Sequence, residues 1–422
     1  MENKIGKTLQ VYLEGVSTLA NKYCGRSFAN KMRSLRTKRE RLLKNNWRKL
    51  PPEALISAEK QEIFRVIDFD TIVLNAVEYL TEEEYVEFLF EVAEISIGFS
   101  EMEKAQRLLH IVVTKLKKFA TELLLAKSHQ RLGDISFYRN NWVTTLRHYK
   151  KSLDLFTKSG DKNGMANVKS SMGSTLVRQG EIVRGEKLLR EAKGIASRAK
   201  ADVLSTAIKA KINYNLGNVY SMQGIWDKAM NCYKESLSLI GRKRNDADRA
   251  YLYLNMAIIF KARGEYEKAL EQFQKSIKFS ISAKDPYKKG LSYLGEAELY
   301  CKTGDLAAST ALATTAFRIF SELGDRLSVA EVYKVFGIIN RENRRYDTAL
   351  SYLKNSKRIN EEYDNPLNLG ETMVEIAKLY GVKGGETDKA RESAESAIAC
   401  FKKINADVKV TEAKEMLAAY TA

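Results

Sequence analysis

The sequence is poor in cysteine and histidine, with four of the first and three of the second in 422 residues. The cysteines form no CxxC pair and are scattered through segments of helical character, which favours buried, reduced thiols in a cytoplasmic protein. The histidines stand at no metal-ligand spacing with a cysteine or a carboxylate pair. The composition therefore predicts no structural metal.

A long apolar run is also missing, so the sequence contains no candidate membrane span. Residues 8–20 are mildly apolar and follow Lys4 and Lys7, but Gln10 and Glu14 interrupt them. We therefore expect a cytoplasmic protein and not a signal peptide. Hydrophobic residues still make up 44% of the chain, which is enough for a continuous core.

Motifs of catalysis are absent as well. The sequence contains no G-x-x-x-x-G-K-S/T, G-x-S-x-G, H-E-x-x-H or dinucleotide-binding glycine pattern. The carboxylates of Glu83-Glu84 and Glu361-Glu362 are adjacent in sequence, so on a helix they do not face each other as an acid–base pair would. We predict that the protein is not an enzyme and uses no cofactor.

What the sequence does contain is a repeated unit, clearest at residues 251–280, YLYLNMAIIFKARGEYEKALEQFQKSIKFS. Leu254, Ala257 and Phe260 recur at the spacing of one helical face. Gly264 suits the turn after a helix end, and a second amphipathic segment follows it. The unit is predicted to be two short helices folded against each other.

The unit recurs every 40 residues, with one step of 44 residues between Gly173 and Gly217. Positions equivalent to Ala257 are all glycine or alanine: Ala93, Gly133, Gly173, Gly217, Ala257, Ala297, Gly337 and Ala377. Positions equivalent to Ala269 are all small: Ala105, Thr145, Gly185, Ala229, Ala269, Ser309, Ala349 and Ala390. Small residues at two fixed positions predict a close helix crossing whose surroundings are filled by larger residues.

Two further expectations follow from the repeat. The turn carries Gly180, Gly224, Gly264, Gly304 and Gly384, and in other repeats Ser100, Asn140 and Arg344 take the place of glycine. The four extra residues of the long step are close to one helical turn, so they are expected to lengthen the second helix of repeat three.

Residues 216–237, LGNVYSMQGIWDKAMNCYKESL, and residues 256–277 resemble the tetratricopeptide repeat. The resemblance covers residues 82–401, and the 40-residue step is similar to the longer repeats of kinesin light chain, Pins-type adaptors and bacterial Rap-like peptide-sensing regulators. It implies an all-α solenoid, a right-handed superhelix of helix-turn-helix repeats whose first helices line a concave groove for other proteins.

The predicted organisation has three parts. Residues 1–80 form a basic helical region that caps the solenoid, with helices at 3–24, 27–49, 53–67 and 70–80. Residues 81–403 contain eight repeats, which begin at a capping box of Thr81 and Glu84. Residues 404–422 contain a last helix, because a solenoid needs its open end covered.

Positive charge is concentrated in the N-terminal region. The chain carries a net charge of +17, and residues 22–49 contain eleven Lys or Arg against one acid, Glu40. The candidate basic patch is Arg33, Arg36, Lys38, Arg39, Arg41 and Lys44. Such a helix can dock on protein, bind nucleic acid in a salt-sensitive way, or meet an anionic membrane. Residues 1–80 contain no legible helix-turn-helix.

The resemblance also implies which residues line the groove. Applied to this sequence, the groove positions of tetratricopeptide repeats are Lys127, Gln130, Arg131, Asp134, Asn167, Arg178, Lys211, Tyr214, Asn215, Asn218, Tyr251 and Asn255. A row of Asn side chains can hold an extended peptide backbone, and Lys or Arg nearby favours acidic side chains or a terminal carboxylate. Taken singly, each of these polar residues can equally face water.

The groove changes character at its ends, where the first repeat offers Glu87, Glu91 and Glu94 and the last repeats offer Glu331, Glu371 and Glu375. We therefore expect an acidic peptide or helix of another protein over repeats two to five, held by a non-catalytic adaptor. Two alternatives stay open: a ligand- or peptide-responsive signalling regulator that acts through residues 1–80, and a nucleic-acid-associated protein that uses residues 22–49.

Overall fold

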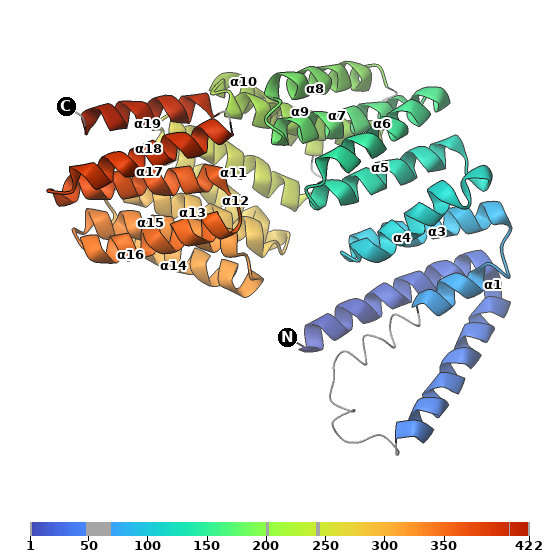
Figure 1. Ribbon diagram of the computed structural model, residues 1–422. Coiled ribbons are helices and arrows are strands. Elements are labelled where there is room, and N and C mark those ends of the chain that lie inside the picture. The colour runs from blue at the N-terminus through green and yellow to red at the C-terminus, as the bar shows by residue number, and fades with distance from the viewer. Residues whose placement is uncertain (1, 48–68, 200–201, 242–244, 405, 421–422) are drawn as a thin grey trace. The chain divides into compact units, whose positions relative to one another are not determined.

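The computed structural model describes residues 2–47, 69–199, 202–241, 245–404 and 406–420, with side chains in the first helix from residue 11 to residue 35. Throughout these residues the chain forms helices and turns and no strand, which confirms the all-α prediction (Figure 1). None of the described helices has both the length and the apolar character needed to span a membrane. The chain divides into two compact units: residues up to 179 with 187–199, and residues 180–186 with those from 200 onward.

The first unit contains the N-terminal helix and the first helix pairs. Its helices are α1 (Glu2–Trp47), α3 (Glu82–Gly98), α4 (Met102–Thr114), η2 (Lys117–Phe119), α5 (Glu122–Tyr138), α6 (Trp142–Ser159) and α7 (Lys162–Arg178). Residues 69–76 are also helical. Helix α8 (Ile182–Ser197) has residues in both units. The predicted capping box is confirmed. The Thr81 hydroxyl accepts a hydrogen bond from the Glu84 backbone N–H, and the Glu84 carboxylate accepts one from the Thr81 backbone N–H.

The second unit is a stack of helix pairs in which each second helix packs on the first helix of the next pair. Its helices are α9 (Val203–Met222), α10 (Trp226–Ile240), α11 (Asp246–Ala262), α12 (Tyr266–Ser282), α13 (Pro286–Thr303), α14 (Leu306–Leu323), α15 (Arg326–Glu342), α16 (Tyr346–Glu362), α17 (Pro366–Lys383), α18 (Thr387–Lys403) and α19 (Asp407–Ala419).

Helix α1 packs on the first repeat. It breaks at Gly25, whose φ of 74° is non-helical, so the two predicted helices at 3–24 and 27–49 are both found as far as Trp47. Its buried side chains include Tyr12, whose hydroxyl lies 3.0 Å from Ser96 Oγ of α3. The predicted segment 53–67 lies outside the described residues.

The two small-residue positions are confirmed as the tight points of the repeat, because all sixteen residues there are buried. A Cβ atom on Gly133 would come within 2.5 Å of the Tyr149 ring, and one on Gly217 within 2.4 Å of the Tyr233 ring. The glycines are therefore required by the rings that fill the helix crossing. The turn prediction also holds for the three substitutes, since Ser100, Asn140 and Arg344 all have positive φ.

One expectation about the 44-residue step is wrong. Helix α8, the second helix of repeat three, has 16 residues, whereas α9, the first helix of repeat four, has 20. Extra residues therefore lengthen α9 at its start, where Asp202 caps the helix by accepting a hydrogen bond from the backbone of Ser205. The cap at Asp202 sets the start of α9, and it decides where the extra residues go more strongly than the expectation that a full turn is added to the second helix of repeat three.

Glu296 occupies a core position. The residue just before the small anchor is apolar in every other repeat, namely Val92, Leu132, Met172, Leu216, Met256, Phe336 and Ile376. Glu296 is 5% exposed, and its Oε1 atom is enclosed without a hydrogen-bond partner. Ser292, one turn earlier on α13, contacts Ser276 of α12, so this face of α13 meets repeat five. Burial raises the pKa of Glu296 to about 7.

Adding a side chain at the helix crossing should destabilise the fold. We expect Gly217→Val to lower the free energy of unfolding by about 1–3 kcal/mol, because its Cβ would displace the Tyr233 ring. Gly194→Ala is the matched control, since a Cβ there meets no atom within 4 Å and alanine favours the helix. Urea denaturation followed by circular dichroism measures both, and equal stabilities for the two variants would contradict the prediction.

Replacing Glu296 by Met should stabilise the protein, and more at higher pH. The folded-state pKa of about 7 lies above the ordinary value of 4.5, so the charging cost begins above pH 4.5 and is complete above pH 7. At pH 8 we expect a gain on the order of 3 kcal/mol from this charge, shrinking toward pH 4.5. Thermal melts of Glu296→Met and of the exposed-site control Glu267→Met at pH 5 and pH 8 test it. A gain in stability that does not depend on pH would show that the charge on Glu296 is not its cause.

Candidate partner-binding groove

First helices form the inner side of each stack. In the first unit α3 contacts α5 and α5 contacts α7, and in the second unit α9, α11, α13, α15 and α17 contact one another in order. Among the described helices, no two second helices of neighbouring repeats make comparable contact. A stack whose first helices are close and whose second helices are apart curves around the first helices, which therefore line its concave face.

A regular set of contacts links these first helices. Pairs of residues 37 positions apart meet across neighbouring repeats: Glu94 with Arg131, Asn218 with Asn255, Lys261 with Glu298, and Lys334 with Glu371. Because the repeats are 40 residues apart, this spacing means that successive first helices are offset by three residues, just under one turn. The concave face is thus held together by polar contacts from one repeat to the next.

In the first unit, two predicted groove residues are engaged within the chain. Arg131 of α5 binds both oxygens of Glu94 on α3, at 2.6 and 2.9 Å, and also contacts Asp134 at 3.1 Å. Asp134 accepts a hydrogen bond of 2.7 Å from the buried Tyr149 hydroxyl of α6. A bidentate guanidinium–carboxylate pair of this kind fixes the spacing of two helices. The main role of Arg131, supported by Asp134, is therefore to hold repeats one and two together.

Other predicted residues of the first unit differ in exposure. Lys127 is exposed, Asn167 is half-buried, and Gln130 is 7% exposed. The exposed Arg178 lies over the Phe137 ring, with 5.0 Å between its Cζ atom and the ring centroid. These side chains do not converge on one point, and each remains a proposal as a contact residue.

The second unit brings four predicted residues together around a fifth. We call Tyr214, Asn218, Tyr233, Tyr251 and Asn255 the tyrosine–asparagine cluster. The Tyr214 and Tyr251 rings meet edge to face at 5.4 Å between centroids. The Tyr233 hydroxyl donates to Asn218 Oδ1 at 2.8 Å, and Asn255 Nδ2 donates to the same oxygen at 3.0 Å. Lys211 is exposed and Asn215 half-buried on the same α9 helix.

The donors and acceptors of the tyrosine–asparagine cluster have fixed roles. Burial raises the pKa values of Tyr214 and Tyr233 above their ordinary values, so both hydroxyls stay protonated near neutral pH. With two donors on its oxygen, the amide of Asn218 is oriented with its NH₂ group toward the Tyr214 hydroxyl. The second hydrogen of that NH₂ group and the Asn255 carbonyl oxygen are not used by these bonds. One donor and one acceptor side by side complement the C=O and N–H of a peptide group.

Tyr233 is the member of the cluster that the sequence analysis missed. Its position in the repeat indicates a core residue, and its ring does pack against Gly217 with 1% exposure. The missed signal is a Tyr sixteen residues after a glycine anchor, found also as Tyr149 after Gly133. In both cases the ring crosses above the glycine and the hydroxyl reaches the residue just after it.

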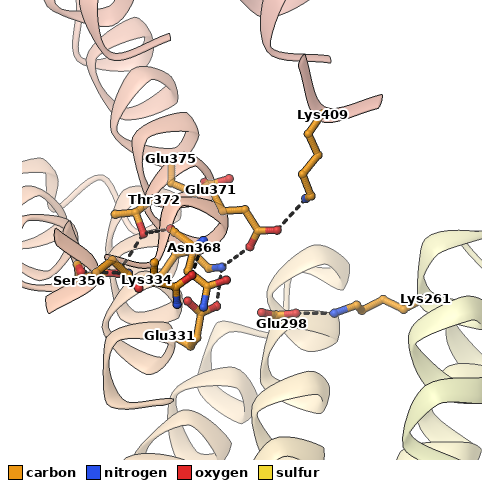
Figure 2. A network of polar contacts seen from close by, with 12 residues as sticks. Lys261, Glu298, Glu331, Lys334, Ser356, Asn368, Glu371, Thr372, Glu375 and Lys409 are labelled. Atoms are coloured by element: carbon orange, nitrogen blue, oxygen red, sulfur yellow. Dashed lines mark hydrogen bonds and ion pairs between the residues drawn. The ribbon is translucent and has the colours of Figure 1, made fainter. Parts of the chain in front are cut away.

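Repeats five to eight of the second unit carry an ion network instead (Figure 2). Lys334 of α15, 6% exposed, contacts Glu331 at 2.7 Å and Glu371 of α17 at 2.6 Å. Lys409 of α19 reaches the same Glu371 at 2.6 Å. Burial alone would raise the pKa of Glu371, but the charges of Lys334 and Lys409 lower it to about 2. The network therefore ties the last helix to two repeats.

The acidic residues expected to give the far end of the groove its charge are thus paired. Besides Glu331 and Glu371, Glu375 contacts Arg341 at 2.5 Å and Lys378 at 2.7 Å. These carboxylates are neutralised within the chain, so they contribute less to the recognition of a partner than the sequence indicated.

The basic N-terminal patch is described only in part. Arg33 is exposed on α1. Arg36, Lys38, Arg39, Arg41 and Lys44 belong to the same helix, but their side chains lie outside the described residues. Binding of nucleic acid or membrane by residues 22–49 stays a prediction.

The three histidines, 19 residues apart in sequence, come together on three helices of the first unit. His129 Nδ1 lies 3.1 Å from His148 Nδ1, and the rings of His110 and His148 are 6.2 Å apart. Burial, with nearby positive charge, lowers the pKa values of His129 and His148 to about 4, so both are neutral at pH 7. Within the described residues, no three His, Cys, Asp or Glu side chains are grouped to hold a metal.

Comparisons with known proteins support the fold. Residues 209–281 match the model of the tetratricopeptide repeat. The quorum sensor NprR from B. thuringiensis is 15% identical, with a TM-score of 0.62 over 83% of this chain and 95% of that one. The Rap conjugation gene regulator of plasmid pLS20, in complex with the Phr* peptide, is 14% identical, with a TM-score of 0.57 over 79% and 93%.

A Rap protein complexed with Competence and Sporulation Factor is 12% identical, with a TM-score of 0.53 over 80% of this chain and 98% of that one. Comparison with curated protein sequences finds no match. The chain therefore has the fold of a tetratricopeptide-repeat solenoid, similar to that of Rap proteins, which confirms the resemblance predicted from the sequence.

Removing the buried cation of the ion network should be costly. We expect Lys334→Met to lower the free energy of unfolding by about 3–5 kcal/mol at pH 7, because Glu331 and Glu371 lose their shared partner. In the variant, burial without the lysine raises the pKa values of both carboxylates, so they are protonated toward pH 4 and the loss should shrink there. Urea denaturation at both pH values checks this against the exposed-site control Lys414→Met. A loss no larger than that of the control would show that the network contributes nothing to stability.

Proposed function

We propose that this protein is a non-catalytic binding protein that holds a peptide, or an extended segment of another protein, on the concave face of its repeats. The observation that carries the proposal is the paired amide of Asn218 and Asn255, held in a fixed orientation by the Tyr233 hydroxyl. A buried tyrosine that spends its only hydrogen on orienting a groove residue favours a built recognition site over a solvated surface.

The cluster suits a peptide for two further reasons. The Tyr214 and Tyr251 rings offer flat contact area with few rotatable bonds, which limits the entropy lost on binding. The exposed Lys211, one turn before Tyr214, favours an acidic side chain or a terminal carboxylate. An acidic peptide over repeats four and five therefore remains our proposal for the partner.

Fold-level similarity supports the same class of function. Two of the solved structures that this chain resembles are complexes, one with the Phr* peptide and one with Competence and Sporulation Factor. We extend to this chain only the general mode, reversible binding of a partner segment by stacked repeats, which a passive adaptor and a ligand-responsive regulator share.

Loss of the amide pair should abolish peptide capture. A phage-displayed library of random heptapeptides serves as the probe, since no natural ligand is assumed. We expect peptides enriched by the wild type to bind the Asn218→Ala/Asn255→Ala variant at least about tenfold more weakly, because two hydrogen bonds to a peptide group are lost. Gln274→Ala, an exposed amide on the second helix α12, is the control and should bind normally. Unchanged affinity in the double variant, with a normal circular dichroism spectrum, would exclude the site.

A further inference from the structure

Two apolar side chains stand exposed on the groove helices beside the tyrosine–asparagine cluster. Met222 is 58% exposed and lies four residues after Asn218 at the end of α9. Ile258 is 42% exposed and lies three residues after Asn255 on α11. Both are therefore about one helical turn beyond the paired amides, on the same side of their helices.

The surroundings limit how large this apolar area is. Three residues further along α11, Lys261 forms an ion pair with Glu298 of α13, and that pair closes the area on one side. Asn218 and Asn255 border it on the other. Two side chains between polar neighbours are far too little for a stable dimer, which needs a total buried area of about 1,000 Å² or more. The area matches one side chain of a bound segment.

Distances along the groove fit an extended peptide. One helical turn advances about 5.4 Å, and an extended chain advances about 3.3 Å per residue. A peptide whose backbone is held at Asn218 and Asn255, and which runs along the helix axes, therefore places a side chain one or two residues away over Met222 and Ile258.

We propose that Met222 and Ile258 form a subsite that selects one aliphatic side chain of the partner peptide, next to the peptide group held by Asn218 and Asn255. The inference rests on the proposed function and adds to it the chemistry that the partner must carry: an aliphatic residue within two positions of the clamped peptide group. Neither is named among the groove residues above, but Ile258 stands at the repeat position of Asn218, and Met222 at that of Arg178.

Introducing a negative charge at the subsite tests this proposal. Positional-scanning hexapeptide libraries are bound to the wild type, to Ile258→Glu and to Met222→Glu. We expect the wild type to prefer an aliphatic residue at one position, and the variants to lose that preference at least tenfold and favour Lys or Arg there. Ile281→Glu changes an isoleucine on the second helix α12 that is 56% exposed; it is the matched control and should keep the wild-type profile.

The outcomes separate this inference from the function on which it rests. Peptide binding with an unchanged aliphatic preference in both Glu variants overturns the subsite and leaves the function standing. A wild type that enriches no peptide overturns the function itself. Analytical ultracentrifugation gives a third outcome. A dimeric wild type together with a monomeric Ile258→Glu variant also overturns the subsite, because a second copy of the chain would then cover these residues.

Discussion

The close crossing of two helices over one small residue is the constraint on which the rest of the structure depends. At Gly217 the crossing is so tight that the Tyr233 ring occupies the space of a missing side chain. The same packing carries the Tyr233 hydroxyl across to the concave face, where it orients Asn218. Core packing and groove chemistry are therefore one feature here, because the ring that fills the interior also delivers a hydrogen-bond donor to the surface.

Stacking then repeats that feature with a constant offset. Neighbouring first helices are displaced by three residues at these contacts, so residues 37 positions apart meet, as Glu94 and Arg131, Asn218 and Asn255, and Lys334 and Glu371 do. What differs between repeats is only the chemistry at those meeting points. At Arg131 and Lys334 opposite charges satisfy each other, whereas at Asn218 and Asn255 two neutral amides meet and keep hydrogen-bonding capacity.

The sequence predicted the fold well because the fold is set by local, periodic signals. Small anchors, turn residues such as Asn140 and the cap at Thr81 act within a single repeat, so one chain is enough to read them. The site was predicted only in part. The groove positions of the repeats that this sequence resembles pointed to Tyr214, Asn218, Tyr251 and Asn255. They could not show that Glu371 is neutralised by Lys334 and Lys409, since those contacts join different repeats. The start of α9 was missed for a different reason, because the cap at Asp202 decided it.

Charge pairing favours repeats four and five as the place of the proposed binding site. In repeats five to eight a partner would have to compete with ion pairs such as Lys334–Glu371, which are half or more buried and gain from the low local dielectric. In repeats four and five the facing groups are amides and aromatic rings, whose desolvation costs far less than that of a charge. A ligand that offers a peptide group there replaces water and breaks no ion pair. Under the proposed function, the contacts that stabilise the stack and the contacts that bind a partner are therefore different, although the repeats share one backbone geometry.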